Sequence, residues 1–317
     1  MYELSDEELK RSSKFGIKDE DLKYLVEVIK FLYKEEVVDS NGNIVIDEKN
    51  GKPKLVDSKR RSGKPKYTHP YNVAAFLYKK GYSREYIITA LFHDVLEDTK
   101  YKEDDIRKIL ENYLNKYPDI AKNREQAFID EILEAVNCVT KKDKISRPKA
   151  PILKLKQEIV LNKIRIVDVT VHNLLDRGYI PVNIEGNLFR VPVTKEDITE
   201  ESILELNNYE NELEQYNNKM SGYINEVKKS EIAKIVKVAD RISNLTDFSP
   251  TDDSNWLEKY IRESSTDCFL DLAKKTDLED DFTIALNTAI LTKEVLERHE
   301  HGNKNELRII KRDEESR

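Results

Sequence analysis

The sequence has few of the residues that break a helix or cross-link a chain. Its 317 residues include only 9 glycines, 9 prolines and 2 cysteines, Cys138 and Cys268. Few glycines and prolines favour helices, and two cysteines are too few for a disulfide framework. We therefore expect a largely helical protein that works in the reducing cytoplasm.

Long apolar runs are also missing. No stretch approaches the roughly 18 apolar residues of a membrane span. The first residues, MYELSDEELKRSSKFG, lack the apolar core of a signal peptide. The formal net charge is −7, which does not favour general binding to nucleic acid, although a local basic patch can still bind phosphates. We expect neither a membrane nor a nucleic acid as partner.

Helical periodicity dominates what is present. Charged residues make up 36% of the chain and apolar residues 38%, and the apolar ones recur at helical spacing over long stretches. Pro70 suits the first position of a helix that Gly81 ends, and Ser83 can cap the next helix. Further helices are expected over residues 5–36, 99–117, 128–139, 256–275 and 281–299, and one or two long helices over 201–245.

Two regions differ from this helical pattern. VVDSNGNIVID, residues 37–47, has an Asn41-Gly42 turn between β-branched runs, which is a hairpin signal. Between about 145 and 205, the β-branched runs IRIVDVTVHNLL and GYIPVNIEGNLFRVPV are broken by glycine and proline. The predicted fold class is therefore mainly α, with short β-hairpins near 37–47 and within 145–205.

One helical stretch carries unusual chemistry. TALFHDVLEDTKY, residues 89–101, places His93, Asp94, Glu97 and Asp98 among apolar neighbours. Burying unpaired charges is costly, so the charges either face water at an exposed helix end or are compensated, for example by a metal ion. Adjacent helical residues point about 100° apart, so His93 and Asp94 can converge on one ion only near a helix end or with help from other segments.

Two more residues can join this cluster. His69 precedes Pro70, where a histidine is usually a loop or capping residue, and Asp240 borders the apolar stripe of IAKIVKVADRISNL, where a surface salt bridge with Lys237 or Arg241 would explain it. Taken together, two imidazoles and two carboxylates form a mixed donor set. That set suits manganese, iron, cobalt or zinc without deciding among them.

The order His…His-Asp…Asp in helical surroundings resembles the HD-domain metal-dependent phosphohydrolase superfamily. Four longer motifs resemble those of the hydrolase domain of the RelA/SpoT family: RRSGKPKYTHPYNVA, HDVLEDT, VNCVTK and VKVADRISNL. They occur in the same order as in the family and cover roughly residues 20–145 and 225–275. The resemblance implies an HD-domain helical bundle.

The resemblance also implies roles for individual residues. A divalent metal, usually Mn²⁺ in the family, would be held by His69, His93, Asp94 and Asp240. The attacking water would be oriented and activated by the acid pair Glu97 and Asp98. A guanine nucleotide substrate would be contacted by Arg60, Arg61, Lys141 and Asn244. The implied reaction removes pyrophosphate from the 3′ position of guanosine tetra- or pentaphosphate, the alarmones of the stringent response, and gives GDP or GTP.

The chain departs from the family mainly between Lys141 and Asp240, where the connection is much longer than usual. We therefore expect an HD hydrolase domain over 1–145 and 225–300, an inserted segment over 146–224 and a flexible tail over 301–317. The insertion could cover the active site, form a homo-oligomer contact or bind a different ligand. Too few residues follow Asp240 for a synthetase domain, so we expect hydrolysis alone.

A second departure is Asp247, close to where the family often has a threonine, and an extra carboxylate there could alter the choice of substrate.

Two alternative functions stay open. The chain could be an HD-type phosphatase or phosphodiesterase acting on another nucleotide, since a fold does not fix a substrate. It could also be a non-catalytic nucleotide sensor. The pair Glu97 and Asp98 argues against the sensor, because sensing needs no water-activating carboxylates.

Overall fold

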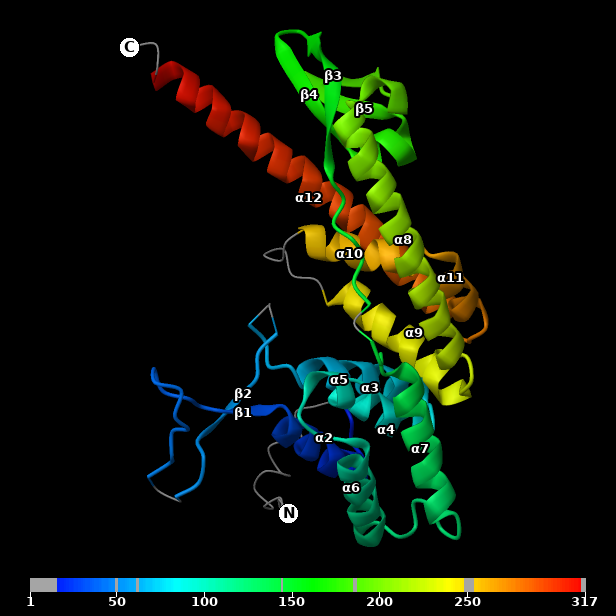
Figure 1. Cartoon of the computed structure of the whole chain (residues 1–317). Helices are drawn as coiled ribbons and strands as arrows, with labels where there is room; N and C mark the ends of the chain where they lie inside the picture. The colour runs from blue at the N-terminus through cyan, green and yellow to red at the C-terminus, as the bar shows by residue number, and fades with distance from the viewer. Residues whose placement is uncertain are drawn as a thin grey trace. The chain divides into compact units, whose positions relative to one another are not determined.

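The computed structural model describes the backbone of residues 16–48, 51–60, 63–143, 145–184, 187–247 and 254–314 (Figure 1). It is mainly helical with short two-stranded antiparallel sheets, which confirms the predicted fold class. The chain divides into two compact units. The first unit comprises residues 1–142 and 224–317, and the second comprises residues 143–223.

The first unit is a bundle built around one buried helix. This helix, α9 (Glu231–Thr246), contacts α3, α4, α7, α10 and α12. From Ile235 to Leu245 every residue of α9 is buried, as expected of a helix enclosed by others. The other helices of the unit are α2 (Glu20–Leu32), α3 (Thr68–Lys80), α4 (Arg84–Phe92), α5 (Val95–Asp98), α6 (Glu103–Lys116), α7 (Glu125–Val139), α10 (Ser254–Ser264), α11 (Asp267–Lys274) and α12 (Glu279–Glu314).

Local sequence explains where two of these helices begin or end. The Ser230 hydroxyl accepts a hydrogen bond from the Ala233 backbone N–H and so caps α9. Helix α3 ends at Gly81, whose φ of 84° is left-handed, as predicted. The predicted start of α3 was wrong. The helix begins at Thr68, so Pro70 is its third residue, where its missing N–H is still not needed within the helix.

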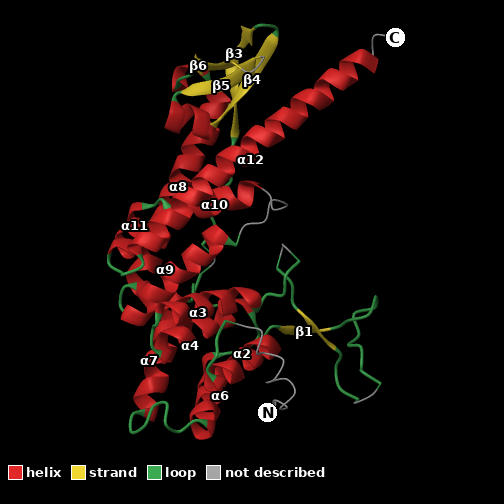
Figure 2. Ribbon diagram, turned by 180° about the vertical axis from the view of Figure 1, so that it is seen from behind, coloured by secondary structure: helices red, strands yellow, loops and turns green. Residues whose placement is uncertain are grey.

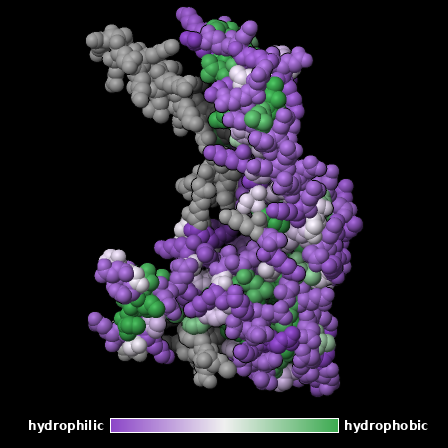
Figure 3. All heavy atoms as spheres, viewed as in Figure 1, coloured by the Kyte–Doolittle hydropathy of each residue, from purple (hydrophilic) through white to green (hydrophobic). Residues whose placement is uncertain are grey.

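A small β excursion leaves the bundle after α2. Strand β1 (Lys34–Glu36), labelled in Figure 2, pairs with β2 (Leu55–Asp57). Between the two strands, isolated bridges join Val38 to Ile44 and Ile46 to Pro53. Gly42 turns this segment with a φ of 82°, which confirms the predicted hairpin near 37–47. Several of its apolar side chains are exposed: Val38, Ile44, Ile46, Leu55 and Val56. Figure 3 shows hydrophobic surface gathered on this excursion.

The second unit has its own sheets and its own core. Strand β3 (Ile152–Leu161) pairs with β4 (Ile164–Thr170), and β5 (Tyr179–Ile184) pairs with β6 (Asn187–Pro192), which confirms the predicted hairpins. Short helical turns span Asn173–Arg177 and Lys195–Asp197, and α8 (Glu200–Val227) follows, with residues 224–227 of this helix already counted in the first unit. The core contains Leu153, Leu155, Val169, Val171, Leu174, Ile180, Val182, Val193, Ile198, Leu206 and Tyr209.

Some predicted boundaries differ from the structure. The predicted helix over 256–275 is two helices, α10 and α11, and the helix expected to end at 299 continues as α12 to Glu314. The flexibility expected of 301–317 stays a prediction. Residues 5–15 of the first predicted helix lie outside the described residues. Within the described part of the chain, no helix combines the length and the apolar character needed to cross a bilayer.

Candidate metal centre and adjoining cavity

The charged stretch 93–98 interrupts the helix that contains it. Helix α4 ends at Phe92 and the single turn α5 begins at Val95, so His93 and Asp94 occupy the break. The break removes the 100° separation that a continuous helix would impose on two neighbours. Their side chains lie together, with His93 Nε2 3.1 Å from Asp94 Oδ2.

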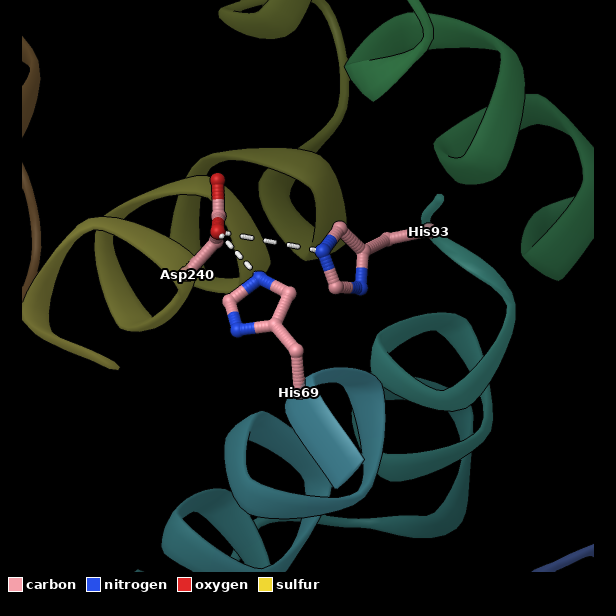
Figure 4. A group of neighbouring side chains, drawn as sticks. All are labelled: His69, His93 and Asp240. Atoms are coloured by element: carbon pink, nitrogen blue, oxygen red, sulfur yellow. Dashed lines mark hydrogen bonds and ion pairs between the residues drawn. The ribbon is translucent and has the colours of Figure 1, made fainter. Parts of the chain in front are cut away.

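Three buried side chains from distant parts of the chain converge beside this break. His69 comes from the start of α3, His93 from the break and Asp240 from α9 (Figure 4). One potential ligand atom from each lies within 4.8 Å of the others. His69 Nε2 is 2.9 Å and His93 Nε2 is 3.8 Å from Asp240 Oδ1. Asp94 borders this group, since its Oδ2 lies 3.6 Å from His69 Nε2.

The hydrogen bonding of His93 shows which ring nitrogen can bind an ion. His93 Nδ1 lies 2.7 Å from the carbonyl oxygen of Ala90, and a carbonyl only accepts, so Nδ1 carries a proton. In the neutral ring, Nε2 therefore points a lone pair at carboxylates. Nε2 is buried and makes no well-formed hydrogen bond among the described residues. A cation between Nε2 and the carboxylates would satisfy them all.

The electrostatics of the group also favour a cation. Burial lowers the pKa of His93, but the negative charges of Asp94 and Asp240 outweigh burial and raise this pKa to about 9. Burial favours the neutral acid of Asp240, yet Lys237 and the two imidazoles hold the pKa of Asp240 well below its usual range. The carboxylate therefore stays ionised. The donor set of two imidazoles and a carboxylate can bind a divalent metal ion.

Neighbouring side chains orient Asp240. Lys237 Nζ donates to Asp240 Oδ2 at 2.8 Å, and Asn244 Nδ2 donates to Oδ1 at 2.6 Å. The salt bridge considered from the sequence therefore exists with Lys237, but it is buried instead of lying on the surface. Arg241 instead forms a buried salt bridge with Glu263, with Arg241 Nη1 2.9 Å from Glu263 Oε2. Second partners of this kind fix the orientation of a ligand.

A cavity of about 220 Å³ adjoins the group. The acidic side chains that line it include Asp94, Glu97 and Asp98. Burial raises the pKa of Asp98, and the nearby charge of Asp94 adds to this effect. The cavity is also lined by the cations Arg60, Lys66, Lys141, Lys237, Arg241 and Lys259. The charge of Lys237 and burial lower the pKa of Lys141. The cavity thus offers cations that can bind negative groups of a ligand, beside the carboxylates around the candidate metal centre.

The structure brings nearly all of the residues predicted from the sequence to one place. His69, Asp94, Glu97, Asp98, Asp240, Arg60, Lys141 and Asn244 line the cavity. His93 contacts Asp94 and Asp240 beside it. Arg61 lies outside the described residues. The functional roles assigned to these residues stay predictions.

Sequence reasoning missed several residues that line the cavity. Lys66 belongs to the basic loop KRRSGKPKYTHP, so its charge was a visible signal. Tyr33, Tyr260 and Glu263 gave no local signal, because only tertiary packing brings them to the cavity. The Tyr33 hydroxyl is buried and has no hydrogen-bond partner among the described residues.

Comparisons with known proteins support the resemblance seen in the sequence. No family model matches the chain. A guanosine-3′,5′-bis(diphosphate) 3′-pyrophosphohydrolase of Aquifex aeolicus is 44% identical over 57 residues, which is 18% of this chain and 8% of that enzyme. The enzyme of the same name from Haemophilus influenzae is 29% identical over 123 residues, 38% of this chain and 15% of that enzyme. The matches thus span less than a sixth of either curated relative.

Proposed function

We propose that this chain is a metal-dependent hydrolase that removes the 3′-pyrophosphate from guanosine tetra- or pentaphosphate. The observation that carries this proposal is the buried group of His69, His93 and Asp240 beside a cavity lined with cations. The names of the two relatives support a pyrophosphohydrolase of guanosine-3′,5′-bis(diphosphate). The products would be GDP or GTP and pyrophosphate.

The metal would be held by His69, His93, Asp94 and Asp240, and we propose Mn²⁺. When bound, a divalent ion lowers the pKa of a coordinated water and so supplies a nucleophile near neutral pH. Ala90 fixes the tautomer of His93, while Lys237 and Asn244 hold the carboxylate of Asp240 in place.

Glu97 and Asp98 would handle the protons of the reaction. Hydrolysis joins the water oxygen to phosphorus, breaks the bond from that phosphorus to the 3′ oxygen, and returns a proton to the 3′ oxygen. Burial raises the pKa of Asp98, which makes it a better proton acceptor near neutral pH. Glu97 is oriented by the Lys141 backbone N–H, which donates to Glu97 Oε1 at 2.7 Å.

The cations of the cavity would bind the nucleotide. Arg60 and Arg61 would lie at the base and a phosphate, since a guanidinium can bind two oxygens at once. Asn244 would help to hold the sugar. Lys141 is a further candidate for a phosphate contact, because it lines the cavity close to Glu97.

The proposal is tested with a panel of nucleotides and a chelator. Chelator-treated protein should release no pyrophosphate from guanosine tetraphosphate, and Mn²⁺ should restore release better than Mg²⁺, because Mg²⁺ rarely accepts imidazole ligands. Full activity in excess chelator would contradict the metal site. Faster release of phosphate from another nucleotide would contradict the substrate.

A further inference from the structure

The carboxylate of Asp247, directly after α9, pairs with two cations, one of which, Arg60, lines the cavity. Asp247 Oδ1 is 2.7 Å from Lys64 Nζ, and Asp247 Oδ2 is 3.4 Å from Arg60 Nη1. The Asp247 backbone N–H donates to the carbonyl of Ser243 at 2.8 Å, which continues the bonding pattern of α9. The backbone that carries the carboxylate is therefore fixed by the helix.

Backbone contacts also fix the two cations relative to each other. The Arg60 N–H donates to the Lys64 carbonyl at 2.8 Å, and Lys59 forms a β-bridge with Pro65. Arg60 reaches α9 a second time, because its Nη2 lies 3.4 Å from Asn244 Oδ1. Arg60 lines the cavity. The net charge of Arg60, Lys64 and Asp247 therefore acts on any ligand in the cavity.

Asp247 reduces the positive charge at this side of the cavity. With it, Arg60, Lys64 and Asp247 carry a net charge of +1, and without it they would carry +2. The side chains of Arg60 and Asp247 are only 18% and 15% exposed, so water screens their interaction incompletely. A ligand phosphate that approaches Arg60 therefore meets a guanidinium whose charge is partly cancelled.

We propose that Asp247 is a specificity residue that limits the affinity of the cavity for the most highly charged nucleotides. The proposal rests on the proposed function, in that it takes the ligand to be a nucleotide with several phosphates. In this view Asp247 weakens the attraction that each additional phosphate would gain from Arg60 and Lys64. The site then binds nucleotides of different phosphate number with similar affinity.

The test is Asp247→Asn, which keeps the shape of the side chain and removes its charge. Calorimetry in Mn²⁺ measures the dissociation constants of GMP, GDP and GTP, none of which has a 3′ phosphate to be hydrolysed. In the variant, GTP should bind roughly three- to tenfold more tightly, the size of one partly screened charge interaction, and GMP should change least. The gain should shrink as salt is added.

Two further variants test whether the change in nucleotide affinity is specific to Asp247. Asp281→Asn removes the same charge from a pair with Lys80 at 2.6 Å, outside the residues that line the cavity, and should leave all three affinities unchanged. Lys64→Met should weaken GTP more than GMP. Equal affinities in Asp247→Asn and Asp281→Asn, or an equal loss for all three nucleotides in Asp247→Asn, would overturn the role of Asp247 alone. If the unmodified protein releases pyrophosphate from guanosine tetraphosphate but binds none of the three nucleotides, the role of Asp247 is overturned while the proposed function stands.

Discussion

At the scale of single residues, the hydroxyl of Tyr33 is a polar group in an unfavourable buried environment. It is buried close to Asp94 and Asp98, and burial together with these carboxylates raises the pKa of Tyr33, so the phenol stays neutral. It makes no hydrogen bond among the described residues. A buried donor without a partner costs about 1–3 kcal/mol.

Tyr33→Phe should therefore leave the free energy of unfolding unchanged or raise it by up to about 1 kcal/mol. Tyr113→Phe is the matched control, because the Tyr113 hydroxyl is also buried but donates to Asp21 Oδ2 at 2.7 Å. Tyr113→Phe should cost roughly 1.5–3 kcal/mol, as for a hydrogen bond to a charged group. Urea denaturation measures both. An equal loss in the two variants would mean that the Tyr33 hydroxyl has a partner.

The proposed ligands and the proposed acid pair should respond differently to mutation. Asp240→Ala removes a carboxylate within 2.9 Å of His69 Nε2 and should lower the metal content of the purified protein. Glu97→Ala should leave the metal bound and lower turnover by about 10²–10⁴-fold, as for a general acid–base group. Elemental analysis and pyrophosphate release measure the two effects. An equal fall in metal content in both variants would show that the roles are wrongly assigned.

At the scale of residues, the sequence predicted which side chains come together at the candidate metal centre. It did not predict all of the neighbouring contacts that fix their positions. His69, His93 and Asp240 could be proposed as partners because their motifs stand in a familiar order. The lysine that holds Asp240 was visible three residues earlier as Lys237. The buried pair of Arg241 with Glu263 was not predictable, because 22 positions separate its members and no periodicity relates them.

At the scale of elements, α2 is fixed to the bundle by a buried carboxylate at its start. Asp21 accepts hydrogen bonds from Arg84 Nε at 2.7 Å and from the Tyr113 hydroxyl. Burial favours the neutral acid, but these bonds and the charge of Arg84 lower the pKa of Asp21 below its model-peptide value of 3.8. Asp21 thus connects α2 to α4 and α6.

Asp21→Asn should lower the free energy of unfolding at pH 7 by roughly 1.5–3 kcal/mol, because bonds to a charged acceptor are lost. The folded-state pKa is lowered, so this stability is present above the unfolded pKa and is lost as the pH falls through the folded pKa. The stabilities of the variant and the unmodified protein should therefore begin to converge as the pH falls below about 3.8. Urea denaturation at pH 7 and pH 3 measures the difference.

Glu20→Gln is the control for this prediction. Glu20 starts the same helix, but its side chain is 73% exposed and pairs with Lys23 at the surface. Surface pairs contribute about 0–1 kcal/mol, so this change should have little effect at either pH. A loss in Asp21→Asn that persists unchanged at pH 3 would contradict the ionic explanation.

The presence of each helix was predicted better than the residues at which it begins and ends. The apolar periodicity of α7 and α9 is strong enough to predict both helices from the sequence. The start of α3 at Thr68 was missed because a proline at the first position is only a preference. The break between α4 and α5 was not predicted as such, because Ala90 to Leu96 reads as one apolar helix. The His93-Asp94 pair was the only sign of it.

At the scale of the whole molecule, the proposed catalytic chemistry belongs to the first unit. Every proposed ligand, together with Glu97 and Asp98, lies within residues 1–142 or 224–317. The second unit has a separate hydrophobic core. Replacing a long segment by a short linker changes the loop-closure entropy only slightly.

A variant in which about residues 150–215 are replaced by a short glycine-serine linker should therefore still bind metal. We expect altered substrate preference or assembly, because the segment contributes none of the proposed ligands. Elemental analysis and turnover on several nucleotides measure these effects, with the full chain prepared in parallel. A soluble, helical trimmed protein that binds no metal would show that the segment completes the site.

The distance along the chain between His69 and Asp240 also has a consequence for biosynthesis. At the usual rate of translation, residues 143–223 take on the order of 4–16 s to make. Throughout that time α3 and α4 have left the ribosome while α9, their central packing partner, does not yet exist. The nascent chain must therefore carry two histidines destined for burial without their carboxylate partner. The metal centre can form only after the second unit has been synthesised.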